Sequence, residues 1–199
     1  ISVWGGDGII RDNEVFANVA SRGAGISTEG LAATISNNVI VCNSVGGVYG
    51  GFTVRSNTVV GNNGSGAVVF AYPWFQRNTV THNLGVGVPC QGTAPGACNN
   101  FFANTNEDPS CFGPGTQNIS VDPLYGETGC PASYCLQLDS PLLPEHSPPG
   151  CGLIGARGVC PALAIDAAAS PEYAAGPLLA RPNPFNPSTT LAFRLADAR

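Results

Sequence analysis

The sequence predicts an all-β solenoid, a parallel β-helix of about five coils. One pattern recurs five times between residues 10 and 104: an asparagine, an apolar residue two places on, and a second asparagine five places on. The leading asparagines follow one another at steps of 25, 19, 21 and 21 residues. A period near 20 residues is typical of a solenoid. The segments are short, rich in Val, Ile and Thr, and interrupted by Gly, Asn and Ser, which favours strands and turns over helices.

Each repeat has the same internal order. An apolar residue precedes the first asparagine by three places in four copies, and Gly96 takes that place in the fifth. A glycine next to an apolar residue closes each of the first four copies. Each unit is therefore interpreted as strand, turn, strand, turn, strand. Leucine-rich repeats have a similar period, but this stretch contains only Leu31 and Leu84.

The repeated asparagines have a structural explanation. A side-chain amide can satisfy turn backbone groups and also bond the same amide one coil above, about 4.8 Å away. Asparagine also tolerates the left-handed backbone of tight turns. We therefore predict two asparagine ladders rather than ligand-binding residues. Their members are Asn13, Asn38, Asn57, Asn78 and Asn99, and Asn18, Asn43, Asn62, Asn83 and Asn104.

Residues 105–160 abandon the repeat and gain Pro and Cys. An open last coil would expose unpaired backbone groups and an apolar cross-section, so we expect these residues to form an irregular cap over that end. The predicted apolar anchors of the cap are Ile119, Val121, Leu124, Tyr134, Leu136, Leu138, Leu142, Leu143, Leu153 and Ile154.

These features together resemble a known family. Residues 1–160 resemble the C-terminal part of a right-handed parallel β-helix protein of the pectin-lyase-like kind. Stretches 118–125, 134–141 and 151–156 are similar to the closing segment of secreted bacterial members. The resemblance implies β-helix coils over 1–104, a cap over 105–160, and export from the cell.

The remaining residues differ in composition. Residues 161–180 are dominated by Ala, Pro and Gly, which is typical of a linker. The string PNPFNPSTT, at 182–190, resembles the opening of the Ig-like domains that serve as type IX secretion sorting signals, and of the related flagellar-hook-like domain. The resemblance implies a contact with secretion machinery. Leu191, Phe193 and Leu195 alternate with small or charged residues and predict one strand, in a disordered or extended tail over 181–199.

Eight cysteines, six of them between Cys98 and Cys160, indicate an oxidising compartment and disulfides. Their spacing does not form the close pairs of a zinc site, so we expect no metal. The simplest closures are Cys90 with Cys98 and Cys151 with Cys160, and the other cap cysteines leave alternatives open. Cys42 is expected to be a buried free thiol.

The charges exclude several partners. Eight arginines, no lysine and thirteen acids give a net charge of −5, which argues against nucleic acid. No run of 18 apolar residues is present, so no membrane span is predicted. We expect a monomer that needs no cofactor. The chain contains no methionine and opens on sequence that already reads as repeat, so we expect further coils upstream.

Catalytic residues are scarce in the repeats. No Asp or Glu occurs from residue 30 to residue 106, whereas glycoside hydrolysis needs two carboxyl groups and calcium needs several oxygen ligands. Asp7, Asp12, Glu14 and Glu29 are interpreted as a solvated face, with a larger upstream site as the alternative. His82 has no acidic partner in its repeat that would support proton transfer, and His146 lies in a Pro-rich loop of the cap, so neither is expected to be catalytic.

A binding function has more support. Tyr72 and Trp74 are candidates to stack on sugar rings, with Arg77 beside them; packing in the core or under a loop is the alternative. We therefore predict a secreted or cell-surface scaffold that binds or presents to extracellular polysaccharide, without catalysis in this part of the protein. The alternatives are the C-terminal part of a polysaccharide lyase or glycoside hydrolase with its site upstream, and an adhesin or structural stalk.

Overall fold

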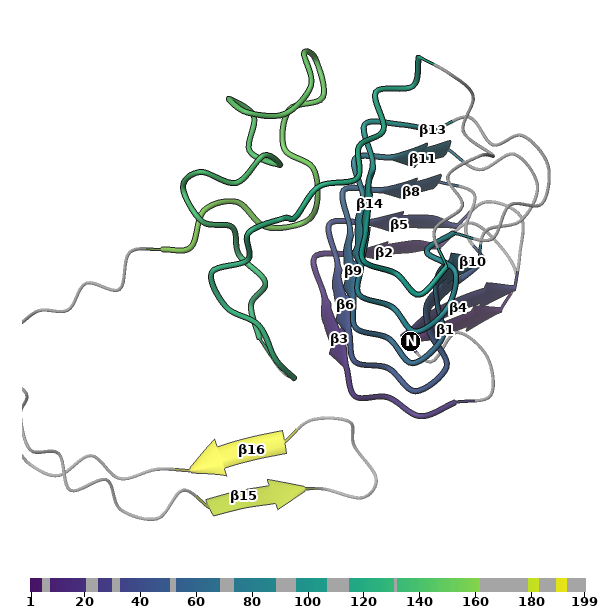
Figure 1. Cartoon of the computed structure of the whole chain (residues 1–199). Coiled ribbons are helices and arrows are strands. Elements are labelled where there is room, and N and C mark those ends of the chain that lie inside the picture. Colours follow the sequence, from purple (N-terminus) through teal and green to yellow (C-terminus); the bar gives the residue numbers. More distant parts are fainter. Residues whose placement is uncertain are drawn as a thin grey trace, which may run out of the picture. The chain divides into compact units, whose positions relative to one another are not determined.

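The computed structural model describes residues 1–4, 8–20, 25–29, 33–50, 53–68, 74–88, 96–106, 115–130, 132–161, 179–182 and 189–192. The chain divides into two compact units, Ile1–Pro161 and Ala162–Arg199. The described residues of the first unit form a parallel β-solenoid without a helix, so the predicted fold class is confirmed (Figure 1).

Three parallel sheets make up the walls of the solenoid; the first four coils contribute one described strand to each sheet in turn, and the fifth contributes strands to sheets 2 and 3. Sheet 1 contains β1 (Ser2–Trp4), β4 (Ile26–Glu29), β7 (Gly46–Tyr49) and β10 (Ser65–Val68). Sheet 2 contains β2 (Ile9–Arg11), β5 (Thr34–Ser36), β8 (Thr53–Arg55), β11 (Trp74–Gln76) and β13 (Gly96–Ala97). Sheet 3 contains β3 (Glu14–Phe16), β6 (Val39–Val41), β9 (Thr58–Val60), β12 (Thr79–Thr81) and β14 (Asn100–Phe102).

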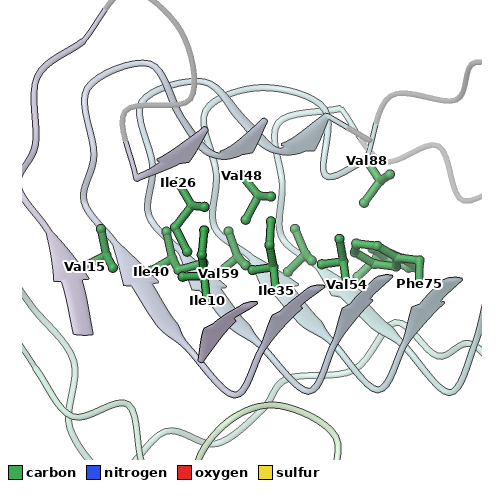
Figure 2. Close-up of a cluster of buried hydrophobic side chains, with 12 residues drawn as sticks. Ile10, Val15, Ile26, Ile35, Ile40, Val48, Val54, Val59, Phe75 and Val88 are labelled. Carbon is green, nitrogen blue, oxygen red and sulfur yellow. The ribbon is translucent and has the colours of Figure 1, made fainter. Parts of the chain in front are cut away.

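The core is a stack of apolar columns. The middle residue of each three-residue strand in sheets 2 and 3 points inward, as Figure 2 shows for Ile35 and Ile40, and both are fully buried. In the fifth coil Gly96 pairs with Phe75 and supplies no side chain. The Phe75 ring fills this space and stacks on Phe101, with ring centroids 6.2 Å apart. The core residues are Ile10, Val15, Ile26, Ile35, Ile40, Val48, Val54, Val59, Phe75, Val80, Val88 and Phe101.

The asparagine ladders are formed as predicted. In the first ladder, each side-chain amide donates to the side-chain oxygen of the next coil at 3.0 to 3.1 Å. In the second ladder the corresponding distances are 2.9 to 3.0 Å. The first ladder also has a sixth member that the sequence reasoning missed, because Asn99 donates to Asn118 at 3.0 Å.

The sequence analysis attributed the left-handed backbone to the ladder asparagines themselves, and this prediction is wrong. The left-handed residue is the one before each ladder asparagine, with φ between 53° and 61° in both ladders. The residue at this position turns the chain, and the asparagine that follows it provides the ladder hydrogen bonds. The left-handed residues are Asp12, Asn37, Ser56, Arg77, Cys98 and Gln117 in the first ladder, and Ala17, Cys42, Gly61, His82 and Ala103 in the second.

The sequence suggested a cap over the open end of the solenoid, but most of the cap lies elsewhere. Residues 116–121 add a partial rung, in which Ile119 bridges Asn100. Residues 122–161 then lie along the outer face of sheet 3 (Figure 1). The Tyr125 hydroxyl is hydrogen-bonded to the hydroxyls of Thr79 and Thr81 on β12, at 3.3 and 3.2 Å. The Ala156 backbone amide donates to the Thr58 hydroxyl on β9 at 2.9 Å.

This placement explains the burial in sheet 3. The outward residues of β6, β9 and β12 are buried under the cap, whereas Glu14 and Phe16 on β3 remain exposed. Most of the predicted apolar anchors of the cap are buried or half-buried, but Leu138 is 73% exposed.

The predicted local disulfides are wrong. Cys98 pairs with Cys151 and Cys160 pairs with Cys135, which excludes both proposed local closures. Cys42 pairs with Cys130 rather than staying a buried free thiol, because its left-handed turn points it outward, toward the cap. Cys90 lies outside the described residues. Two of these disulfides therefore fasten the cap to the side of the solenoid.

The second unit contains a hairpin. β15 (Leu179–Pro182) pairs antiparallel with β16 (Thr189–Ala192). The strand predicted around Leu191 is present, and its partner lies at the end of the segment predicted to be a linker. The alternating residues 193–196 lie outside the described residues.

Candidate functional site

The outer face of sheet 2 is an open β-surface. Its strands align in register, so the outward residues form two columns across successive coils. All eight of these side chains are exposed or half-buried, in contrast with the cap-covered face of sheet 3. The first column contains Ile9, Thr34, Thr53 and Trp74, and the second contains Arg11, Ser36, Arg55 and Gln76.

The structure places two of the three predicted sugar-binding residues at this face. Trp74 begins β11 and is 53% exposed, so it is not a core residue. Arg77 follows β11 at the left-handed turn and is exposed. Tyr72 lies outside the described residues.

A groove of about 370 Å³ adjoins the second column. One wall is the turn between sheets 2 and 3, and the other is the cap segment that contains Leu153 and Gly155. The Gly155 amide donates to the Arg77 carbonyl at 2.7 Å, which fixes the cap beside the turn. The groove is lined by Arg11, Asp12, Ser36, Asn37, Arg55, Ser56, Arg77, Leu153 and Gly155.

Positive charge predominates in the groove, which has three arginines against one aspartate. Arg11 lies 3.7 Å from the Asp12 carboxylate, and both side chains are well exposed. Asp12 also accepts a hydrogen bond from the side-chain amide of Asn37 in the next coil. Arg77 donates to the Gly150 carbonyl at 3.5 Å. Arg55 forms no ion pair with any described residue. The groove can therefore accept an anionic group without breaking a strong internal pair.

The other candidate residues are not assembled into a reactive site. His82 is exposed and its ring lies edge-on to Phe102, with centroids 5.8 Å apart. His146 places Nδ1 3.0 Å from the Ser140 carbonyl in the cap. Glu14 pairs with Arg157 at 2.6 Å. Each side chain thus has a structural contact, and no two of them converge on a common point in the contacts described.

In the part of the chain that the structure describes, no three or more His, Cys, Asp or Glu side chains are grouped so that they could hold a metal ion. Nor does any helix among the described residues have the length and apolar character needed to cross a membrane.

Comparison with known proteins does not extend this description. No protein-family model matches the chain, and neither the curated proteins nor the solved structures yielded a match.

Sequence reasoning found part of the site. Trp74 and Arg77 are predicted there as binding residues, whereas Arg11 and Arg55, which line the groove from one column, are given no such role. The second wall was not foreseen, because Leu153 and Gly155 reach the groove only through the sideways placement of the cap. The available signal was the outward column itself, in which two arginines alternate with a serine.

Proposed function

We propose that this protein is a secreted or cell-surface β-solenoid that binds extracellular polysaccharide along the outer face of sheet 2. The observation that carries the proposal is an exposed tryptophan on a flat, polar β-face beside a groove. An aromatic ring presents an apolar surface with defined geometry, which suits stacking on a sugar ring. Thr53 in the adjacent coil and Gln76 on the same strand as Trp74 can exchange hydrogen bonds with sugar hydroxyls.

The extracellular location is supported by three disulfides among the described residues, because such bonds persist in oxidising compartments. The resemblance of residues 1–160 to secreted pectin-lyase-like proteins supports it further, as does the resemblance of the tail to a type IX sorting domain. We propose that the tail directs export and that the solenoid is the part that binds. The long rigid face suits an extended polymer, since its columns repeat with every coil.

The proposal is tested by measuring the affinity of the whole chain for a panel of soluble polysaccharides. The variant Trp74→Ala should weaken binding about tenfold, because losing a contact of about 1.4 kcal/mol has that effect. Leu84→Ala is the matched control, since Leu84 is an apolar side chain of similar exposure, 65%, outside sheet 2.

Equal loss in the two variants would place binding elsewhere. Unfolding in urea should be alike for both variants, because both side chains are largely exposed. Release of reducing ends or unsaturated products from the bound polymer would instead favour an enzyme.

A further inference from the structure

The groove beside sheet 2 has a regular charge pattern. Arg11 pairs in register with Ser36, and Ser36 pairs with Arg55. The two arginines therefore project from the same column and are two coils apart, about 9.6 Å at the usual strand spacing. A neutral hydroxyl lies between them.

Negative charge lies next to this neutral interval. The Asp12 carboxylate accepts a hydrogen bond from Asn37, which belongs to the same coil as Ser36. The carboxylate is thus directed from the first coil toward the second, the coil that separates the two arginines. An anionic group placed beside Ser36 would approach this carboxylate, and like charges repel. Sugar hydroxyls there could instead bond Ser36, Asn37 and Ser56, which line the same groove.

Arg77 has a different position from the other two arginines. It belongs to the turn column rather than the strand column, and its guanidinium donates to Gly150 in the cap at 3.5 Å. It therefore forms part of the cap-side end of the groove. The repeating element that faces a ligand is the sequence of Arg11, Ser36 and Arg55.

We propose that this groove selects an acidic polysaccharide in which every second sugar carries the anionic group. Two coil steps match the length of a disaccharide unit in an extended glycan. Each arginine can form a forked pair of hydrogen bonds with a carboxylate or a sulfate. The intervening sugar is neutral and meets Ser36. This inference rests on the proposed polysaccharide-binding function and specifies the ligand class for it.

The test compares three oligosaccharides of equal length by titration calorimetry at low ionic strength. Hyaluronan oligosaccharide carries a carboxylate on alternate sugars, oligogalacturonate carries one on every sugar, and cello-oligosaccharide is neutral. The whole chain should bind the hyaluronan probe at least tenfold more tightly than either of the others. Added salt should weaken this binding, because exposed charge pairs are screened.

Variants assign the effect to the groove. Arg11→Gln and Arg55→Gln should each weaken hyaluronan binding about tenfold. Arg157→Gln removes the same charge outside the groove and should have little effect. Asp12→Asn should improve binding of oligogalacturonate more than binding of hyaluronan, because it removes the repulsion beside the neutral interval.

The outcomes separate this inference from the proposed function. If the neutral probe binds as tightly as hyaluronan and depends on Trp74, polysaccharide binding stands and charge selection is wrong. If oligogalacturonate binds as tightly as hyaluronan, the alternating pattern is wrong. If Arg157→Gln has the same effect as Arg55→Gln, the assignment of charge selection to this groove is wrong. If none of the three probes nor any of the wider polysaccharide panel binds, the proposed function itself fails.

Discussion

Asn57 donates a hydrogen bond from its side-chain amide to the side-chain oxygen of Asn78, 3.0 Å away in the next coil. The same amide donates to the Ile35 carbonyl in the preceding coil, also at 3.0 Å. The Asn57 oxygen accepts from both the backbone and the side chain of Asn38. One fully buried side chain therefore connects three successive coils.

Replacing Asn57 with alanine should be strongly destabilising. The change leaves the Asn38 amides and the Asn78 oxygen short of buried partners, and each unsatisfied group costs about 1–3 kcal/mol. We expect the free energy of unfolding in urea to fall by about 3 kcal/mol or more. Asn63→Ala is the control, because Asn63 is exposed and lies outside both ladders; its cost should stay below about 0.5 kcal/mol. Equal effects would contradict a special role for the ladder.

Gly47→Ala should also destabilise the solenoid. A Cβ atom at Gly47 would lie 2.3 Å from the Val59 side chain and 2.6 Å from the Gly66 carbonyl oxygen. Because the second contact is with backbone, side-chain movement cannot relieve it, and we expect a loss of about 3 kcal/mol. At Gly158 a Cβ atom would meet nothing within 4 Å, so Gly158→Ala should leave the urea midpoint nearly unchanged.

The disulfide pairs can be checked by peptide mapping without reduction. Linked peptides should join Cys42 to Cys130, Cys98 to Cys151, and Cys135 to Cys160. Replacing Cys98 and Cys151 together with serine should lower stability by up to about 4 kcal/mol, the chain-entropy value for a loop of that length. The sequence separation of this pair is 53 residues. A peptide joining Cys90 to Cys98 would show that the local closure forms instead.

Tyr125 should make stability fall at high pH. Burial against sheet 3 takes the Tyr125 hydroxyl out of water. This raises its pKa from the ordinary value of 10.0 to about 12. Because the folded state holds this proton more tightly, the contribution is complete below pH 10 and is lost as pH rises from 10 to about 12. Because the Tyr125 ring is only half-buried, we expect this contribution to the free energy of unfolding to be about 2 kcal/mol.

The measurement is urea unfolding at several pH values across this window, compared between the unmodified chain and Tyr125→Phe. The variant should lose most of the decline assigned to this hydroxyl. It should also be less stable below pH 10, because Thr79 and Thr81 lose a hydrogen-bond partner. An unchanged pH dependence in the variant would assign the decline to other groups.

The coils were predictable because their contacts repeat with the sequence period. A parallel stack in register puts Ile35 over Val54 and Asn38 over Asn57, so the columns read from the sequence are the columns in space. Asn118 was overlooked, although its step of 19 residues from Asn99 equals an earlier one. The apolar pattern around it no longer matches the repeat, because only a partial rung forms there.

The cap was less predictable because its contacts have no period. Cys42 and Cys130 are 88 residues apart, and no local pattern pairs them. The residues aligned with Cys42 in the next two coils are Gly61 and His82. This composition indicated a turn position rather than a core position. The sequence alone also left open whether Trp74 is exposed. The register of β11 with β8 places it in the outward column.

The left-handed residues before the asparagines of the second ladder form a row of positions, one per coil, whose residue type varies from coil to coil. The ladder hydrogen bonds are made by the asparagine that follows, so they do not involve the side chain at this position, and only Cys42 among the second-ladder residues is tied to the cap by a disulfide. Alanine, cysteine, glycine and histidine all occupy this position in the second ladder. A surface designed on the solenoid could therefore place one chosen chemical group per coil in a row, with a spacing of about 4.8 Å set by the fold.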